Sequence, residues 1–351
     1  MDETGAGVAI SVRRVDVLLL PTWPRVSVVV PTYNRAASLR RLLRSLECAE
    51  VPVGGMEIVV VIDGSTDDTI SVVDGSQARW VSQPNRGRAI ARQRGWREAR
   101  GEVIVFLDDD VVPEPNAIIR MVEALDEADG VGATILPLDV KPVIAHYMHV
   151  DGIVNHYERA GNALWLITAA AAFRREALER IGGFDVAYEQ AGEDVDLTLR
   201  LVESGGTIRV VASAVVYHDH RSRLVGLWST CYRYGRAYRA LGSRHVVHRS
   251  ERRRSAVGRA NPVEWWRVYR NYRQHASVLR SLAFLGLHAA VAGPYAMGLL
   301  RGNRTPAKTL PSAGVELVGR PSALGWARRD GEAEPLADLT GQGMAQAAQS
   351  S

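Results

Sequence analysis

Three adjacent carboxylates form the densest chemical feature of the sequence. Asp108, Asp109 and Asp110 follow residues 103–107, an uninterrupted apolar run that predicts a strand buried on both faces. Because unpaired charge is costly to bury, the strand should end there and leave the acids at its carboxyl edge, where open α/β sheets bind ligands. Clustered carboxylate oxygens suit a divalent cation, Mn²⁺ or Mg²⁺, held jointly with substrate phosphates. These residues alone leave a solvated acidic loop open as the alternative.

A second acid, Asp63, occupies the same position after residues 58–62, another apolar run. Its carboxylate could accept hydrogen bonds from a nucleotide base or ribose, although DGSTDD is also favourable turn and N-cap chemistry. Arg88 and Arg92 lie four residues apart, hence on one face of the helix expected there. The two arginines could meet a diphosphate or form a solvated face. Acidic loops at neighbouring strand ends favour a crevice for a nucleotide and a metal ion.

A third group of acids, Glu193, Asp194 and Asp196, lies in the first turn of a predicted helix. Acids at this position interact favourably with the helix dipole, but three in four positions exceed what capping requires. A carboxylate that faces a metal crevice could act as a general base.

His218 follows a predicted strand at 208–216. It could bind a metal or phosphate, or lie at a helix cap or the surface.

The elements that must position these residues alternate between strands and helices. Such alternation predicts an α/β fold, a doubly wound, mostly parallel sheet with helices on both faces. No GxGxxG turn or GxxxxGK[ST] loop occurs. In the first half the pattern predicts strands at 26–30, 58–62, near 81 and at 103–107, with helices over 36–47, from 69 and over 85–99. In the second half it predicts helices over 116–127 and 174–180, and strands or floor segments at 130–137 and 161–172.

Composition indicates a globular protein with a full core, since 46% of the 351 residues are hydrophobic and 23% charged. The net charge of +4 is concentrated in one segment: between Arg221 and Arg273 the only acids are Glu251 and Glu264. Two cysteines predict neither a disulfide framework nor a thiolate zinc site and favour a reducing compartment. The apolar stretch 17–20 is too short for a signal-peptide core.

Residues 221–301 are predicted to form a basic and apolar helical appendage. Trp265, Tyr269 and Tyr272 form an aromatic stripe, which indicates either a packed helix with a solvated basic face or a surface for anionic lipid or an anionic acceptor such as a lipid-linked saccharide. Residues 282–300 have borderline length for a membrane span and are interpreted as a buried or interfacial helix. No recognition motif accompanies the arginines, so nucleic acid is not expected as a partner.

Seven segments occur in a particular order along the chain. They are VSVVVPTYNR at 26–35, VVVIDGSTDDT at 59–69, NRGRAIARQRG at 85–95, FLDDD at 106–110, GGFD at 182–185, GEDVDLTLRL at 192–201 and VYHDH at 216–220. In this order they resemble the family 2 glycosyltransferases of GT-A fold, over roughly residues 25–225. Two departures are Gln93, where many members have Asn, and the lack of a QxxRW segment after Asp194, which argues against a processive polysaccharide synthase.

The resemblance implies an inverting transfer of a sugar from a UDP-, dTDP- or GDP-sugar to a hydroxyl of a glycan, glycolipid or small-molecule acceptor, with Mn²⁺ or Mg²⁺. It also implies these roles: Asp194 as catalytic base; Pro31, Tyr33, Asp63, Arg92, Asp108 and Asp109 at the nucleotide-sugar; Asp110 and His218 at the metal; Glu193 and Trp165 on the acceptor side. Two alternatives stay open: a polyprenyl-phosphate glycosyltransferase, and a catalytically silent sugar-nucleotide-binding or membrane-scaffold subunit.

The expected organisation has five parts. We expect a cytoplasmic protein that contacts the inner face of the plasma membrane through its helical appendage. The parts are an N-terminal extension at 1–24, a nucleotide-sugar-binding half at 25–112, an acceptor-binding and catalytic half at 113–220, the appendage at 221–301 and a tail at 302–351 whose composition predicts disorder.

Overall fold

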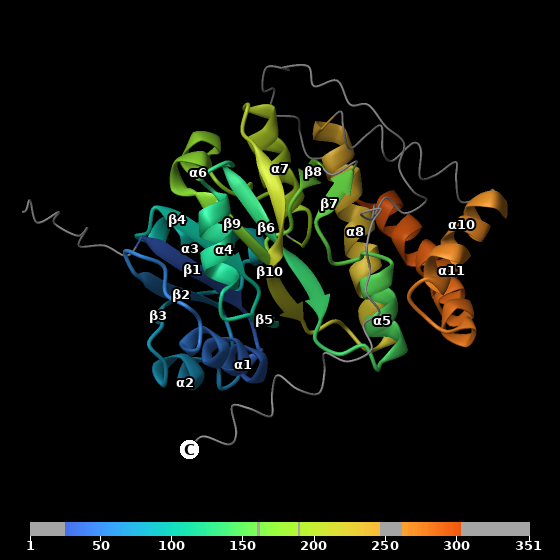
Figure 1. The fold of residues 1–351 in the computed structure, drawn as a ribbon, viewed down its shortest axis with the longest axis horizontal. Coiled ribbons are helices and arrows are strands. Elements are labelled where there is room, and N and C mark those ends of the chain that lie inside the picture. Colours follow the sequence, from blue (N-terminus) through green and yellow to red (C-terminus); the bar gives the residue numbers. More distant parts are fainter. Residues whose placement is uncertain (1–24, 160–161, 189, 246–261, 303–351) are drawn as a thin grey trace, which may run out of the picture.

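An eight-stranded mixed sheet organises the computed structural model, which describes residues 25–159, 162–188, 190–245 and 262–302 (Figure 1). The strands are β1 (Val26–Thr32), β2 (Met56–Asp63), β3 (Arg79–Gln83), β4 (Val103–Leu107), β5 (Val111–Pro113), β6 (Gly130–Pro137), β7 (Tyr157–Arg159), β8 (Asn162–Trp165), β9 (Ala170–Arg174) and β10 (Ile208–His218). The helices are α1 (Ala36–Glu47), α2 (Thr69–Asp74), α3 (Arg88–Glu98), α4 (Ala117–Ala124), α5 (Val143–Val150), α6 (Arg175–Ile181), α7 (Glu193–Glu203), α8 (Leu224–Arg244), α10 (Pro262–Arg273) and α11 (Val278–Arg301).

The first half of the sheet is parallel, in the order β3-β2-β1-β4. In this register Val28 lies between Ile58 of β2 and Val105 of β4. Because the four strands run the same way, their carboxyl ends share one edge of the sheet. Asp63 at the end of β2 and Asp108 just after β4 therefore lie along that edge. The strands predicted near residues 28, 60, 81 and 105 are all confirmed.

The second half of the sheet is mixed. β9 is antiparallel to both β4 and β6, whereas β10 runs parallel to β6 and antiparallel to β5. The β5–β10 pairing sets His218 opposite Val111, and the amide of Asp219 donates to the carbonyl oxygen of Asp110 at 2.9 Å. The stretch 161–172, predicted as strands or floor segments, is divided: β8 pairs with β7 in a separate hairpin, and β9 joins the main sheet.

Helices cover both faces of the sheet, as the alternating pattern predicted. Successive strand residues point to opposite faces, so Val28 packs with Leu42 of α1 in one core cluster. Val29 lies in the other cluster, with Trp96 of α3 and Leu197 of α7. The prediction of a doubly wound, mostly parallel α/β sheet with C-terminal helices is confirmed.

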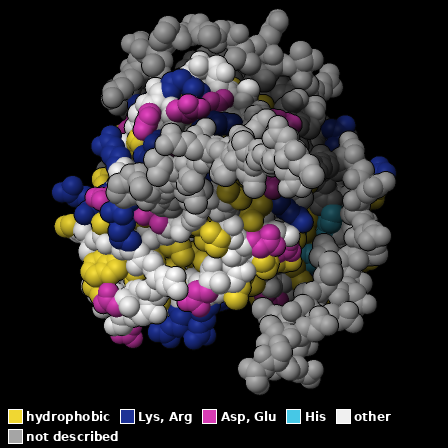
Figure 2. Space-filling model, turned by 60° about the vertical axis from the view of Figure 1, so that its left-hand side comes forward, with side chains coloured by type: hydrophobic (Ala, Val, Ile, Leu, Met, Phe, Trp, Pro, Cys, Tyr) yellow, Lys and Arg dark blue, Asp and Glu magenta, His cyan; other side chains and the backbone are white. Residues whose placement is uncertain are grey.

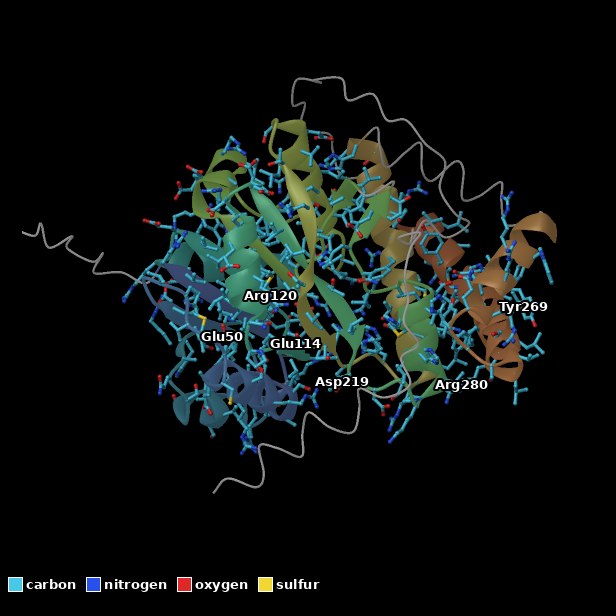
Figure 3. The ribbon with its side chains drawn as sticks, in the orientation of Figure 1. Glu50, Glu114, Arg120, Asp219, Tyr269 and Arg280 are labelled. Carbon is cyan, nitrogen blue, oxygen red and sulfur yellow. The ribbon has the colours of Figure 1, made fainter. Side chains whose placement is uncertain are left out.

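The C-terminal helices form a third cluster with α5. Tyr272 of α10 is buried there, and its hydroxyl donates to Asp151 at 2.6 Å. Gly235 of α8 and Gly298 of α11 allow close helix crossing, because a Cβ atom at Gly235 would lie 2.1 Å from a backbone oxygen of α11. Figure 3 shows Tyr269 of α10 at the end of the molecule farthest from the sheet. Arg280 of α11 donates to the carbonyl oxygens of residues 140 and 141.

Helix α11 is longer than the predicted segment 282–300 and has an exposed apolar side. Among the described residues, α11 is the helix whose length and composition would allow it to cross a membrane. Only 22% of its most apolar stretch is buried in the fold. The exposed residues include Leu279, Leu282 and Leu300. On the face of the molecule that is turned toward the viewer in Figure 2, acidic and basic side chains are interspersed. The N-terminal extension at 1–24 and the tail after residue 302 lie outside the described residues.

Candidate active site

The carboxyl edge of β4 carries a candidate metal centre. Asp108 and Asp110 follow β4, and His218 ends β10, which reaches the same place through its pairing with β5. One ligand atom from each of these three side chains lies within 4.8 Å of the others. Two carboxylates and an imidazole form a donor set that fits Mn²⁺ or Mg²⁺. Nδ1 of His218 lies 2.9 Å from Nδ1 of His220, a contact that orients the His218 ring.

The middle acid of the triplet, Asp109, lies apart from this cluster. Its buried carboxylate accepts a hydrogen bond from Thr32 at 2.8 Å, and burial together with Asp110 raises the pKa of Asp109 to about 7. Asp110 behaves differently, although burial by itself would raise its pKa. His218 and the ion-paired Arg35 lower the pKa of Asp110, so this carboxylate stays charged. The charged state is the one that a cation requires.

Arg92 of α3 connects the metal centre to α7. Its side chain is 2% exposed, donates to Asp108 at 2.5 Å and forms an ion pair with Glu193. Burial alone would lower the pKa of Arg92, but Asp108 and Glu193 raise it. The alternative prediction, in which Arg92 belongs to a solvent-exposed arginine face, is therefore wrong. The predicted contact of Arg92 with the nucleotide stays a prediction.

Asp194 lies in the first turn of α7, and its carboxylate lines the same cavity as Asp108 and Asp110. Burial and the adjacent Glu193 raise the pKa of Asp194 to about 7, although Arg92 acts in the opposite direction. A carboxylate with a pKa near neutrality suits proton abstraction. Glu193 itself is buried and does not line the cavity. Its assignment to the acceptor side stays a prediction.

Asp63 anchors the loop before α3. Its carboxylate is 5% exposed and accepts from Gln83 Nε2 at 2.8 Å and from the backbone amides of Arg86 and Gly87 at 2.9 and 2.8 Å. Gly64, which follows, has φ +77° and approaches the backbone of residue 85, so a side chain there would clash. Asp63 does not line the cavity. Its predicted contact with a nucleotide base stays a prediction.

Three other predicted residues also lie outside the cavity lining. Tyr33 is exposed after β1, and Pro31 is half-buried within it. Trp165, assigned to the acceptor side, is buried and stacks on Tyr157 with ring centroids 4.1 Å apart. The cavity, of about 240 Å³, is instead lined by the metal-centre acids, Asp194 and residues of α8.

Several residues that line the cavity lie at positions for which no functional role was predicted. They are Arg35, Met148, Val154, Ile167, Gln190, His220, Arg221, Thr230, Arg233 and Tyr234. Arg221, Arg233 and Tyr234 belong to the segment 221–301, for which either a packed helix with a solvated basic face or a surface for an anionic ligand was predicted. The helical period places Thr230, Arg233 and Tyr234 on one face of α8, which is the available sequence signal.

Comparison with known proteins supports the family assignment. Residues 27–182 match the model of glycosyl transferase family 2. This match over 156 of the 351 residues confirms, for that part of the chain, the resemblance drawn from the ordered segments.

The relatives share only part of their length with this chain. It is 26% identical over 254 residues to the probable glycosyltransferase YdaM of Bacillus subtilis (65% of this chain, 59% of that protein). It is 30% identical over 242 residues to the pre-mycofactocin glycosyltransferase of Mycobacterium tuberculosis (64% and 49%). The chain thus spans about half to three-fifths of these relatives. Mannosyltransferase PcManGT from Pyrobaculum calidifontis, solved with GDP-Man and Mn²⁺, aligns with TM-score 0.49 and 22% identity over 81% of this chain and 77% of that one.

Proposed function

We propose that the protein is a metal-dependent inverting glycosyltransferase that moves a sugar from a nucleoside-diphosphate donor to an acceptor hydroxyl. One observation carries the proposal: Asp194 lines the same cavity as Asp108, Asp110 and His218. A cation centre and a carboxylate with a raised pKa, facing one space, are the two groups that such a reaction needs. UDP-, dTDP- and GDP-sugars are the candidate donors, and a glycan, glycolipid or small molecule is the candidate acceptor.

Each residue has a distinct part in this mechanism. Asp108, Asp110 and His218 would hold the divalent cation, and the cation when bound would supply Lewis acidity toward the departing diphosphate. Asp194 takes the proton from the acceptor hydroxyl as its oxygen forms a bond to the anomeric carbon. The bond from that carbon to the diphosphate oxygen breaks on the opposite side, so a single displacement inverts the configuration. Arg92 holds Asp108 and Glu193 in place around the two centres.

Donor turnover tests the proposal directly. The full chain is incubated with UDP-, GDP- and dTDP-sugars, with and without Mn²⁺, and nucleoside diphosphate release is measured with each donor. We expect release from at least one donor, dependent on the cation. The proposal fails if no donor in the panel binds or turns over; a chain that binds donors without turnover would instead be the catalytically silent subunit.

The predicted contact with a membrane surface is a separate proposal. Leu279, Leu282 and Leu300 are exposed on α11, which carries Arg280 and Arg301 near its ends. Apolar side chains flanked by arginines suit the boundary of an anionic bilayer. Flotation of the full chain with vesicles that contain phosphatidylglycerol tests this contact, and vesicles of phosphatidylcholine alone provide the control. If the chain floats with neither kind of vesicle, the proposed membrane contact is wrong.

A further inference from the structure

Tyr234 of α8 lines the cavity and has no part in the mechanism proposed above. Its side chain is half-buried, yet among the described residues its hydroxyl has no hydrogen-bond partner. The hydroxyl oxygen is not enclosed by the fold either. A tyrosine hydroxyl that is neither paired nor enclosed is open to the cavity that the residue lines, where a ligand can reach it.

Packing fixes the direction of this side chain. Tyr234 packs against the third core cluster, which contains Met148 of α5, and Val154 packs against the same cluster. Met148 is 1% exposed. Because core side chains are close-packed, the ring of Tyr234 has little freedom to turn away. Its hydroxyl therefore stays at the wall of the cavity, which Met148 and Val154 also line.

Tyr234 and Asp194 line the cavity from different helices, α8 and α7. Burial, followed by the charge of Asp194, raises the pKa of Tyr234. The phenol therefore keeps its proton and can donate a hydrogen bond. The carboxylate of Asp194 accepts from the amide of Val195 at 2.8 Å but not from the hydroxyl of Tyr234. A hydrogen-bond donor and a proton acceptor thus remain available to the same ligand.

Aliphatic side chains lie beside these two groups. The amide of Leu166 donates to Oγ1 of Thr198 at 3.3 Å, and this hydroxyl donates to the carbonyl oxygen of Asp194 at 3.0 Å. Ile167, the next residue, therefore lies close to the first turn of α7, and it lines the cavity. Three residues make up this aliphatic wall: Met148, Val154 and Ile167.

Charged groups of the cavity gather around the metal centre instead. Arg88 and Arg221 interact electrostatically with Asp110, so these two cations belong to the donor side. Tyr234, Asp194 and the aliphatic wall remain for the acceptor. One hydrogen-bond donor and one carboxylate set in an aliphatic wall suit an uncharged hydroxyl compound that has an apolar face.

We propose that Tyr234 binds the acceptor: its hydroxyl donates a hydrogen bond to the reacting oxygen of the acceptor, whose own proton points to Asp194. The aliphatic wall contacts the carbon skeleton that carries this hydroxyl. The inference rests on the proposed function and names the class of its acceptor, an uncharged hydroxyl compound with an apolar face. Tyr234 keeps its proton, the proton of the acceptor passes to Asp194, and the bonds that form and break are those given above.

The test measures binding of small probes to the full chain by fluorine NMR, with and without Mg²⁺ and UDP, at a pH above the pKa of Asp194. The probes share one ring: para-fluorobenzyl alcohol carries the hydroxyl, para-fluorotoluene lacks it, and para-fluorobenzyl phosphate replaces it with an anion. We expect the alcohol to bind at millimolar concentrations, about threefold to tenfold more tightly than the toluene, which is the net effect of a hydrogen bond. The phosphate should bind more weakly than the alcohol, because the carboxylate of Asp194 repels it.

Tyr234→Phe removes the hydroxyl alone. It should weaken the alcohol by about threefold to tenfold and leave the toluene unchanged. Tyr232→Phe is the matched control, because Tyr232 is a half-buried tyrosine of the same helix that lies outside the cavity lining. The thermal unfolding midpoint of Tyr234→Phe should equal that of the native chain, since the lost hydroxyl has no partner in the described part of the fold.

A second variant tests the aliphatic wall. Val154→Thr replaces a methyl group of the cavity lining with a hydroxyl and should weaken the alcohol and the toluene alike, by about fourfold. If both probes bind Val154→Thr as they bind the native chain, the apolar half of the proposal is wrong.

Three results overturn the assignment of Tyr234. One is that the native chain binds the alcohol no more tightly than the toluene, or binds neither. Another is equal binding of the alcohol to the native chain and to Tyr234→Phe. The third is a preference for the phosphate probe that disappears in Arg233→Gln, which would make the acceptor an anion held by Arg233.

Failure of the proposed function gives a different result. Probe binding requires neither turnover nor a bound nucleotide, so a chain that releases no nucleoside diphosphate can still bind the alcohol through Tyr234. Conversely, a chain that turns over a donor but binds the alcohol equally well as Tyr234→Phe keeps the proposed function, and only the role of Tyr234 is wrong.

Discussion

Arg92 and Glu193 form a buried ion pair between helices that lie about a hundred residues apart in the chain. The same guanidinium also pairs with Asp108, so one buried cation joins the end of β4 to the first turn of α7. Both candidate centres, the metal cluster and Asp194, are adjacent to this connection. Its removal should therefore affect stability and activity together.

Arg92→Gln should destabilise the fold by about 3–5 kcal/mol, because it leaves the buried carboxylate of Glu193 and the partly buried carboxylate of Asp108 without their cation. Denaturant unfolding of both proteins measures the difference. Arg97→Gln on the same helix is the control, since Arg97 is exposed and its loss should cost less than about 1 kcal/mol. Equal stability of the two variants would show that the buried pair is not a structural connection.

Asp194→Asn should reduce sugar transfer to a hydroxyl acceptor by about 10²–10⁴-fold, the usual contribution of a general base. Nucleoside diphosphate affinity should change little, because the amide keeps the shape of the carboxylate. Asp126→Asn, at an exposed position, serves as the control for handling and folding. A small effect on transfer would favour the polyprenyl-phosphate alternative, in which a phosphate nucleophile needs less help from a base.

The pH dependence of transfer should show an acidic limb near the raised pKa of Asp194, about 7. A base works only when deprotonated, so kcat/KM should rise with pH up to this value and fall about tenfold per pH unit below it. Glu193→Gln removes a like charge, lowers the pKa of Asp194 and should move the limb to lower pH. Asp109→Asn should leave the limb in place; if it removes the limb, Asp109 is the titrating group.

Metal binding should distinguish neighbours in the acidic triplet. Asp110→Asn removes a predicted ligand and should weaken Mn²⁺ by more than about tenfold, the lower end of effects seen even for outer-shell changes. Asp109→Asn should weaken it much less, because Asp109 bonds to Thr32 and lies outside the ligand cluster. Mn²⁺ titration followed by electron paramagnetic resonance, with nucleoside diphosphate present, compares the two. Similar affinities in both variants would contradict the assigned cluster.

Asp63→Asn should destabilise the protein by about 1–3 kcal/mol, since an amide nitrogen cannot accept the hydrogen bonds now made to one of the carboxylate oxygens. The loop before α3 should loosen, and nucleoside diphosphate affinity should fall with it. Thermal unfolding and nucleotide titration measure both effects. A variant with native stability but altered preference between UDP and GDP would instead show direct contact with the base.

Much of this protein follows from local sequence pattern. The apolar runs at 26–30, 58–62 and 103–107 determine buried strands, because β-branched residues with no polar alternation fit only a sheet covered on both faces. The acids that follow the last run could not remain inside it, so the position of Asp108 and Asp110 at the strand end was fixed as well. Asp194 in a first helical turn was equally local.

Tertiary structure decided which of these groups meet. His218 lies beside Asp110 only because β5 pairs antiparallel with β10, and strand pairing over that distance has no local signal. Likewise, helical period alone could not show that Arg92 is buried between two carboxylates, or that Arg221 and Arg233 enter the cavity, because these depend on how α3, α7 and α8 dock. Hydrophobic periodicity reports which face of an element is buried, whereas the partner across that face is chosen by packing of the whole chain.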